Sequence, residues 1–152
     1  YLLIGSNIEP EQNIRSALQM LQEIQPIKRC SRIWKTAAYG NSGPDFLNIV
    51  IQIETLISLF EYKEKVITRI ETALKRKRFP DKNAPRTIDI DILIFGDQII
   101  EPEIGTKFFI TIPLADLLPE WIDPTSGKSL KAIQKEMLAQ GLAVLYAECL
   151  PT

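Results

Sequence analysis

The chain has 152 residues, of which 45% are hydrophobic and 24% charged, a balance typical of a globular domain with its own core. We therefore predict one domain over residues 1–152. The net charge of −1 provides no overall field for nucleic acid or an anionic membrane, so neither is an expected partner and positive charge can act only locally. The absence of histidine removes the most common general base and metal ligand.

Cysteine content and hydropathy indicate the cellular compartment of the protein. Cys30 and Cys149 have no metal-type spacing, and two thiols in a chain of this length predict a reduced, cytoplasmic protein rather than a disulfide scaffold. No apolar run approaches the ~20 residues that a membrane-spanning helix needs. We expect a cytoplasmic protein.

The hydrophobic pattern predicts alternating strands and helices. Strands are expected at 1–4, within 30–40, at 45–55 and at 87–95, with helices at 9–24 and 56–77. The proline-containing segment 78–86 is expected to be a loop, followed later by a short strand at 108–114 and a helix at 129–140. This order matches the βαββαβ ferredoxin-like pattern, an α+β fold, with additions at the C-terminus. The alternation at 45–55 indicates a mainly antiparallel sheet with one face available to a ligand.

Two carboxylates interrupt an isoleucine-rich strand. Asp89 and Asp91 are two residues apart and therefore share one face, opposite Ile88, Ile90 and Ile92. A solvated face on an edge strand would explain a lone pair, but the following "ILIF" favours a central, buried strand. Two adjacent carboxylates repel by roughly 1–4 kcal/mol, so a cation is expected to offset them. Mg²⁺ fits oxygen ligands, whereas zinc or iron would call for His or Cys.

A basic run precedes these carboxylates. "KRKR" at 75–78 could simply complement the end of a helix. It continues, however, into a loop with Lys82 and Arg86 that leads directly to the aspartates. Arginine is suited to bidentate contacts with phosphate oxygens, and metals and cations together stabilise phosphoryl transfer. The glycine-rich phosphate motif of P-loop proteins is absent.

The segment "KNAPRTIDIDIL" at 82–93 resembles the signature of the 6-hydroxymethyl-7,8-dihydropterin pyrophosphokinase family at every defined position. Further matches occur in family order at "IGSN", "SRIWKTAAYG", "PDFLN" and "IPLADLLPEW", so the resemblance covers nearly the whole chain. It implies an α/β/α ferredoxin-like fold. It also implies an ATP-dependent transferase of folate biosynthesis, which moves a pyrophosphoryl group from ATP to the hydroxymethyl group of a dihydropterin and releases AMP.

The resemblance also implies roles for individual residues. Two Mg²⁺ ions would bind to Asp89 and Asp91, and Arg76 and Arg86 would contact the transferring phosphates. The remaining implied contacts are to ATP from Glu71, Arg78 and Lys107, and to the pterin from Asn48, from Phe46 and Phe109, and from backbone groups of Thr36, Ala37 and Tyr39.

Each of these residues also has an ordinary structural interpretation. The two phenylalanines could be core aromatics, and Thr36 could simply fill a strand. Glu71 could be an exposed helix residue or a partner of Arg78. Asn48 is more informative, because a buried amide within an apolar strand requires hydrogen-bond partners.

The sequence departs from the family pattern in three places. Ala84 replaces the more common Gly, which the signature tolerates. Asn83 stands where the family often has a tryptophan. A short segment that contains a histidine is missing between residues 103 and 108, through a deletion or because it is absent from this sequence; the abrupt join favours the second explanation. Fusion to, or association with, dihydropteroate synthase is left open.

Two other functions remain alternatives. One is a ferredoxin-like RNA-binding module, although such sheets display aromatic residues where this one carries Asp and Asn. The other is a catalytically impaired pseudo-enzyme.

Overall fold

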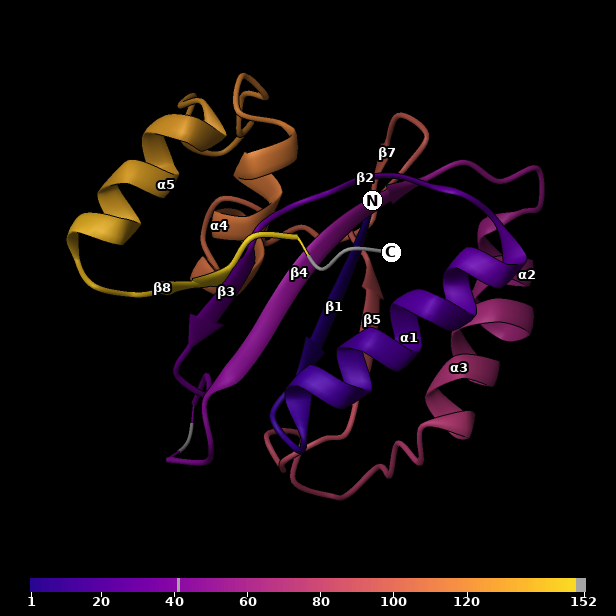
Figure 1. Cartoon of the computed structure of the whole chain (residues 1–152). Coiled ribbons are helices and arrows are strands. Elements are labelled where there is room, and N and C mark those ends of the chain that lie inside the picture. Colours follow the sequence, from indigo (N-terminus) through magenta and orange to yellow (C-terminus); the bar gives the residue numbers. More distant parts are fainter. Residues whose placement is uncertain (41, 150–152) are drawn as a thin grey trace.

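The computed structural model describes residues 1–40 and 42–149 (Figure 1). Its strands are β1 (Leu2–Ser6), β2 (Ile27–Cys30), β3 (Ile33–Thr36), β4 (Phe46–Ile53), β5 (Asp89–Ile92), β6 (Ile94–Phe95), β7 (Gln98–Ile99) and β8 (Val144–Ala147). Its helices are α1 (Pro10–Ile24), α2 (Leu59–Tyr62), α3 (Thr68–Ala73), α4 (Phe108–Leu117) and α5 (Leu130–Ala139). A π-helical segment, η1 (Lys63–Ile67), joins α2 to α3. The helix predicted at 56–77 is therefore one continuous element of three parts, but it begins at Leu59 and ends at Ala73, before the basic residues at 75–77.

The main sheet has the order β5-β1-β4-β3-β8, and β2 also pairs with β4. All these pairings are antiparallel. If β2 and β3 are counted as one strand, the core has four strands in chain order: β1, β2–β3, β4 and β5. They lie side by side in the order 4-1-3-2, which confirms the ferredoxin-like prediction. The strand β8 was not predicted, and it extends this sheet beyond β3.

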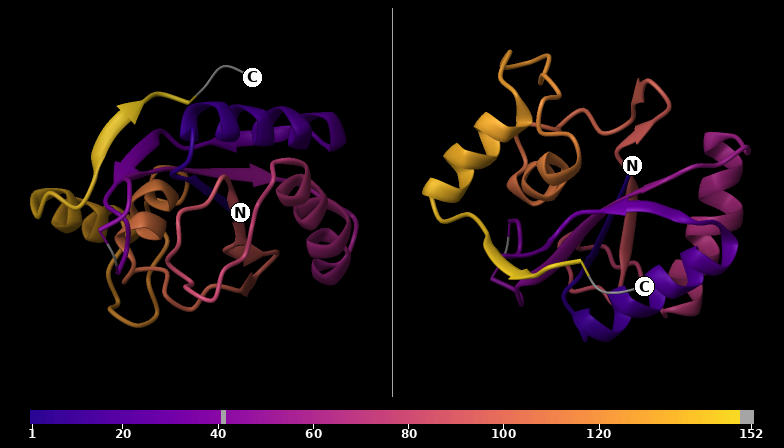
Figure 2. Two further views of the ribbon diagram at one scale, coloured as in Figure 1. Left: turned by 90° about the horizontal axis from the view of Figure 1, so that it is seen from below. Right: turned by 45° about the horizontal axis from the view of Figure 1, so that its top comes forward.

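Helices cover both faces of the sheet. Leu2, Ile4 and Ile49 pack with α1, η1 and α3 in one buried cluster, whereas Leu3 and Val50 pack with α4 and α5 in a second. Figure 2 shows α1 on one side of the sheet and α4 with α5 on the other. The α/β/α layering is therefore confirmed. The prediction of one face open to a ligand is wrong for most of the sheet, since α4 and α5 cover it.

Residues 108–114 form the first part of α4 rather than the predicted strand. Ile110, Thr111, Ile112 and Leu114 are all buried, so this segment has no clear exposed polar side. Hydrophobic periodicity cannot separate a short buried strand from a buried helix, which explains the error.

The strand that carries the two aspartates lies at the edge of the sheet, not at its centre as predicted. Its isoleucines are nevertheless buried, because Ile88, Ile90 and Ile92 pack into the cluster beneath α1 and α3. The apolar run reflects helix packing against an edge strand.

Cys30 and Cys149 form a disulfide with a Cα–Cα distance of 6.1 Å, which corrects the prediction of two reduced thiols. Their sequence separation of 119 residues conceals this proximity, which arises because β2 and β8 lie near each other at one side of the sheet. No helix in the described part of the chain is long and apolar enough to cross a membrane.

Candidate active site

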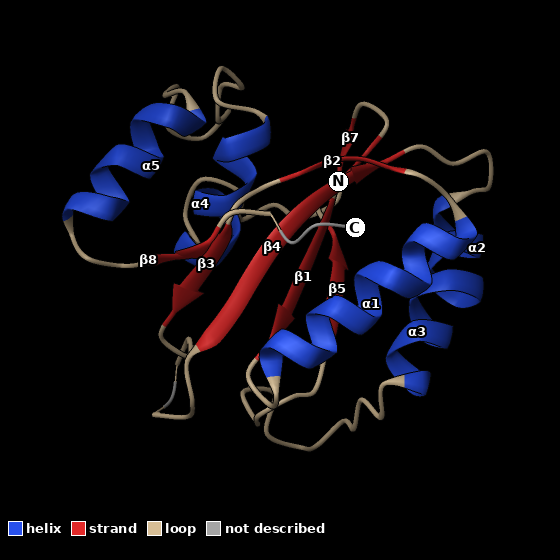
Figure 3. Cartoon of the chain, viewed as in Figure 1, coloured by secondary structure: helices blue, strands red, loops and turns tan. Residues whose placement is uncertain are grey.

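Two loops meet at one end of the sheet (Figure 3). One follows β3, and the other is the basic loop that joins α3 to β5. They approach closely: the side-chain nitrogen of Asn83 lies 3.1 Å from the position that a Cβ would take on Gly40, whose φ is +77°. A pocket lies between these loops and the sheet.

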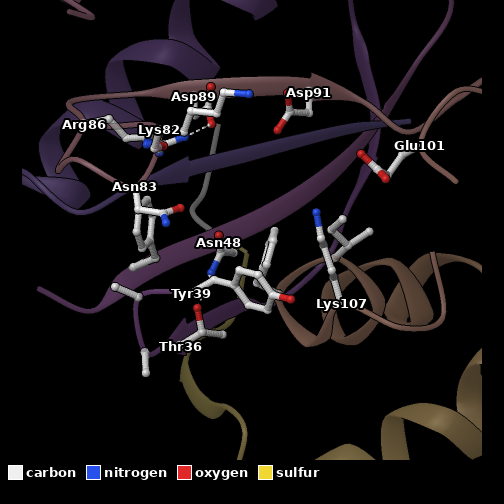
Figure 4. Close-up of a pocket in the computed structure, with 15 residues that line it drawn as sticks. Thr36, Tyr39, Asn48, Lys82, Asn83, Arg86, Asp89, Asp91, Glu101 and Lys107 are labelled. Atoms are coloured by element: carbon white, nitrogen blue, oxygen red, sulfur yellow. Dashed lines mark hydrogen bonds and ion pairs between the residues drawn. The ribbon is translucent and has the colours of Figure 1, made fainter. Parts of the chain in front are cut away.

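This pocket has a volume of about 230 Å³. Figure 4 shows the aspartates and Arg86 along one side of it, Asn48 and Tyr39 across from them, and Lys107 at one end. Ten of the thirteen predicted site residues line it: Thr36, Ala37, Tyr39, Phe46, Asn48, Arg86, Asp89, Asp91, Lys107 and Phe109.

The other three predicted residues lie in adjoining spaces that share both aspartates. Arg76 and Arg78 line a cavity of about 390 Å³ with Asp89 and Asp91. Glu71 lines a further cavity, again with Arg78 and the aspartates. The two aspartates thus line all three cavities, which places them where a ligand larger than one pocket could contact both.

The two aspartates have different electrostatic environments. Asp89 forms ion pairs with Arg86 at 2.6 Å and Arg76 at 3.9 Å. No ion pair of Asp91 occurs among the described residues. Although Asp91 remains accessible on the edge strand, desolvation by the surrounding protein raises its pKa to about 7, and the charges of Asp89, Glu71 and Glu101 add to this effect.

The two carboxylates are suited to a cation whose coordination is completed by the phosphates of a substrate. The described residues contain no group of three or more His, Cys, Asp or Glu arranged to hold a metal ion by themselves. Mg²⁺ needs no such cage, because it commonly uses one or two carboxylates together with substrate phosphates. The unneutralised charge around Asp91 fits this mode of binding. Glu101, which contributes to that charge, was not predicted from the sequence.

The raised pKa of Asp91 predicts a pH-dependent affinity for Mg²⁺. The proton competes with the cation for this carboxylate, so the apparent Kd for Mg²⁺ with a non-hydrolysable ATP analogue should rise as pH falls through 7. Below that pH we expect about a tenfold rise per pH unit if one proton must leave. Titration calorimetry between pH 8 and 6 measures it. Equal affinities across this range, or the same slope in Asp91→Asn, would contradict the assignment.

Two arginines near the aspartates have a side-chain donor without an acceptor. The Nε atoms of Arg76 and Arg86 are buried and have no hydrogen-bond partner among the described residues. Buried donors normally have an acceptor, so an anion such as phosphate would satisfy them. The largest influence on the pKa of Arg76 is burial, which lowers it.

Asn7 fixes the end of the basic loop to β1. Its side-chain oxygen accepts the Arg86 N–H at 2.8 Å, and its own N–H donates to the Arg86 carbonyl at 3.2 Å. Ser6 Oγ donates to the carbonyl of Thr87 next to it. Asn7 was not among the predicted site residues, and the only sequence signal for it was the "IGSN" match.

Glu71 is buried and supports the aspartate strand. One carboxylate oxygen accepts the N–H of Ile90, the residue between the two aspartates, at 3.0 Å. The other accepts from Arg78 at 3.2 Å, which confirms the predicted pairing and excludes a fully exposed helix position. Burial raises the pKa of Glu71. Glu71 therefore satisfies an N–H on the open side of β5.

Glu71→Ala should destabilise the protein, because it leaves the buried Ile90 N–H without its acceptor. A loss of about 1–3 kcal/mol in unfolding free energy is expected, measured by urea denaturation. Glu71→Gln keeps an oxygen acceptor and should lose less. Glu64→Ala, on the exposed surface of the same continuous helix, is the matched control. Equal stability of Glu71→Ala and this control would contradict the role.

Polar and aromatic groups line the opposite side of the pocket. The side-chain nitrogen of Asn48 donates to Thr36 Oγ1 at 2.8 Å, and both residues are buried. Phe46 lies under the Arg86 guanidinium at 5.8 Å, so it faces the site rather than filling the core. This wall can hold a flat heterocycle with polar edges.

A second aromatic group stands near Lys107. The rings of Tyr39 and Phe109 are 5.5 Å apart, and the Lys107 ammonium is 5.7 and 5.9 Å from them. Lys107 also forms an ion pair with Glu103. Tyr39 is 53% exposed, and its ring contacts with Lys107 and Phe109, two other lining residues, place its side chain at the pocket.

The backbone between Glu101 and Lys107 is a continuous turn. Gly105 donates its N–H to Thr111 Oγ1 at 3.1 Å, and the Asp123 carboxylate lies 2.7 Å from where a Cβ would stand. Gly105 has a φ of +95°, so both geometry and space require glycine here.

Comparisons with known proteins agree with the geometry. Residues 1–119 match the family model described as 7,8-dihydro-6-hydroxymethylpterin-pyrophosphokinase (HPPK). A 2-amino-4-hydroxy-6-hydroxymethyldihydropteridine pyrophosphokinase from Synechocystis sp. is 31% identical over 138 residues, covering 84% of this chain and 70% of the relative. One from Aquifex aeolicus is 34% identical over 148 residues and 90% of both chains. The folic acid synthesis protein fol1 of Schizosaccharomyces pombe is 31% identical over 93% of this chain, which spans 21% of that longer protein.

Proposed function

Because the chain belongs to the 7,8-dihydro-6-hydroxymethylpterin-pyrophosphokinase family, we propose that it transfers a pyrophosphoryl group from ATP to 6-hydroxymethyl-7,8-dihydropterin in folate biosynthesis. The observation that carries this proposal is the arrangement of one pocket. It has a polar and aromatic wall at Asn48 and Phe46, and it opens onto Asp89, Asp91 and Arg86 on the other side.

The proposed reaction is a displacement at the β-phosphorus of ATP. The hydroxymethyl oxygen forms a bond to Pβ, and the bond from Pβ to the oxygen that bridges it to Pα breaks. AMP leaves, the hydroxyl proton passes to solvent, and the product is the pterin diphosphate. No described side chain is a clear general base, and positioning with charge neutralisation can carry such a transfer.

The aspartates would hold two Mg²⁺ ions together with the triphosphate. When bound, these ions neutralise phosphate charge and activate the phosphorus toward attack. Asp91 supplies a carboxylate without an ion-pair partner among the described residues, whereas Asp89 must first be released by its arginines.

The basic residues would bind the phosphates. The buried Nε donors of Arg76 and Arg86 point to these two as the groups that contact the transferring phosphates. Arg78 and Lys107 would complete the ATP site, and Glu71 would act on it through Arg78 and β5.

The pterin would lie against the opposite wall. Because the Asn48 nitrogen donates to Thr36, its amide oxygen is the group that can accept from the N–H edge of the pterin. Phe46 and Phe109 would contact the ring faces, with Ala37 and Tyr39 beside them.

Cellular context follows from this chemistry. We infer a cytoplasmic enzyme, since ATP is its substrate, and there the Cys30–Cys149 disulfide would meet cellular thiols. We also infer that dihydropteroate synthase, which consumes the pterin diphosphate, is the partner in a fusion or complex. A fusion is supported by the longer folic acid synthesis proteins of Schizosaccharomyces pombe and Dictyostelium discoideum, which contain a matching segment.

The test is AMP formation from ATP, Mg²⁺ and 6-hydroxymethyl-7,8-dihydropterin, followed by chromatography. We expect one AMP for each pterin diphosphate and no AMP without the pterin. Mg²⁺-dependent binding of a non-hydrolysable ATP analogue without turnover would instead indicate a pseudo-enzyme. Salt-dependent binding of a mixed RNA pool, without turnover, would favour the RNA-binding alternative.

A further inference from the structure

Gly5 occupies a central position beneath the proposed site. In the register of β1, it pairs with Asn48 of β4 on one side and with Asp89 of β5 on the other. Directly paired residues in a sheet project to the same face. Gly5 therefore lies between the amide proposed to contact the pterin and a carboxylate proposed to bind metal, which are roughly 10 Å apart across two strand spacings.

The backbone does not require glycine at this position. Gly5 is not among the glycines of the described chain with positive φ, which are Gly40, Gly96, Gly105, Gly127 and Gly141. It lies in a regular strand, where glycine is unfavourable unless another group approaches closely. The reason for glycine must therefore be space.

The side chain of Asn48 lies closest to the space beside the Gly5 α-carbon. A Cβ on Gly5 would lie 3.0 Å from the Asn48 side-chain oxygen, whereas the next nearest groups, in Phe46 and Leu47, are at 3.7 and 4.0 Å. Asn48 cannot easily move away, because it is only 3% exposed and its nitrogen donates to Thr36 Oγ1 at 2.8 Å. The amide is thus held between Thr36 on one side and the bare α-carbon of Gly5 on the other.

We propose that Gly5 is a positioning residue for pterin specificity, acting through the orientation of the Asn48 amide. A methyl group at Gly5 would press on the Asn48 side-chain oxygen and displace the amide by a few tenths of an ångström, which strains its hydrogen bond with Thr36 and shifts its oxygen. This inference rests on the proposed function, because it assumes that Asn48 contacts the pterin.

The experiment compares Gly5→Ala with the wild type by equilibrium binding. We expect the Kd for 6-hydroxymethyl-7,8-dihydropterin to rise about tenfold or more, since a hydrogen bond is lost and a buried polar group is left unpaired. The Kd for Mg²⁺ with a non-hydrolysable ATP analogue should stay within about twofold, and the KM for the pterin should change more than kcat.

A double-mutant cycle with Asn48→Ala tests the mechanism. If Gly5 acts through Asn48, adding Gly5→Ala to Asn48→Ala should have no further effect on pterin binding. Ile4→Val, which alters the core-facing side of the same strand, is the stability control and should leave both Kd values unchanged. If Gly5→Ala fails to fold, recovery of folding in the double variant supports the proposal, and failure of the double variant overturns it.

The remaining outcomes distinguish a failure of the role of Gly5 from a failure of the proposed function. If wild-type protein binds the pterin and Gly5→Ala binds it equally well, or loses the ATP analogue to the same degree, the role of Gly5 is wrong and the proposed function stands. If wild-type protein does not bind the pterin at all, the proposed function fails and the inference falls with it.

Discussion

Replacing Asp91 by asparagine is expected to abolish AMP formation while leaving the fold intact. The loss should be at least on the order of 10²–10³-fold, because a carboxylate proposed to bind the metal becomes a neutral amide. The fold should remain intact because of the surroundings of Asp91. Asp91 has no ion pair among the described residues, so its removal leaves no cation unpaired.

The stability of this variant should rise slightly at high pH. The folded protein raises the pKa of Asp91 to about 7, so its ionised form is disfavoured relative to the unfolded chain, and this cost is present above that pH. Below the unfolded pKa the group is neutral in both states and the difference disappears. Thermal unfolding of the wild type and Asp91→Asn at pH 5 and pH 8 would measure the trend.

Asp89→Asn provides an informative contrast. It should also abolish turnover, but it removes the partner of both Arg76 and Arg86 and should therefore destabilise the protein. Asp97→Asn, in the exposed turn between β6 and β7, is the matched control for both changes. Turnover that survived in Asp91→Asn would show that the metal assignment is wrong.

Reduction of the Cys30–Cys149 disulfide is expected to lower the unfolding free energy by about 2–5 kcal/mol. The bond closes a loop with a sequence separation of 119 residues, so the oxidised unfolded chain has much less conformational freedom than the reduced one. It also joins β2 to the segment that follows β8, and β8 pairs only with β3 in the described structure. Chemical denaturation with and without dithiothreitol measures the difference.

The matched control is the double variant Cys30→Ser/Cys149→Ser. Its unfolding midpoint should equal that of the reduced wild type and should not respond to dithiothreitol. Turnover should be little affected in either form, because neither cysteine lines the pocket. Two free thiols in protein purified without reductant, with the same midpoint in both conditions, would restore the original expectation of a reduced pair.

Local patterns predicted the core of the fold, the shared face of the two aspartates and the basic loop, whereas most of the other candidate site residues came from the resemblance to the family. The two-residue period of a strand was enough to place Asp89 and Asp91 on one face, and helical periodicity located α1 and the α2–η1–α3 element. The basic loop was recognised by its prolines and by the absence of any apolar period. These features depend on residues that are close together in the sequence.

Features that depend on tertiary neighbours were missed or misplaced. The edge position of β5 was hidden because helices bury its isoleucines as fully as neighbouring strands would. The roles of Asn7 and Gly5 arise from partners on other elements, and the disulfide joins distant segments. Glu101 lies beyond the hairpin of β6 and β7, and its proximity to Asp91 has no local sequence signal.

The ion pairs of Asp89 have a consequence for binding. Its two carboxylate oxygens face Arg76 and Arg86, so a divalent cation that binds to Asp89 would compete with both arginines for its negative charge. Any cation that takes up Asp89 frees guanidinium donors for phosphate, and any phosphate that draws the arginines away frees Asp89. The free energies of cation and nucleotide binding are therefore coupled, and by linkage each should increase the affinity of the other by the same factor. Under the proposed metal assignment, Asp89 would therefore make cation binding and nucleotide binding positively cooperative.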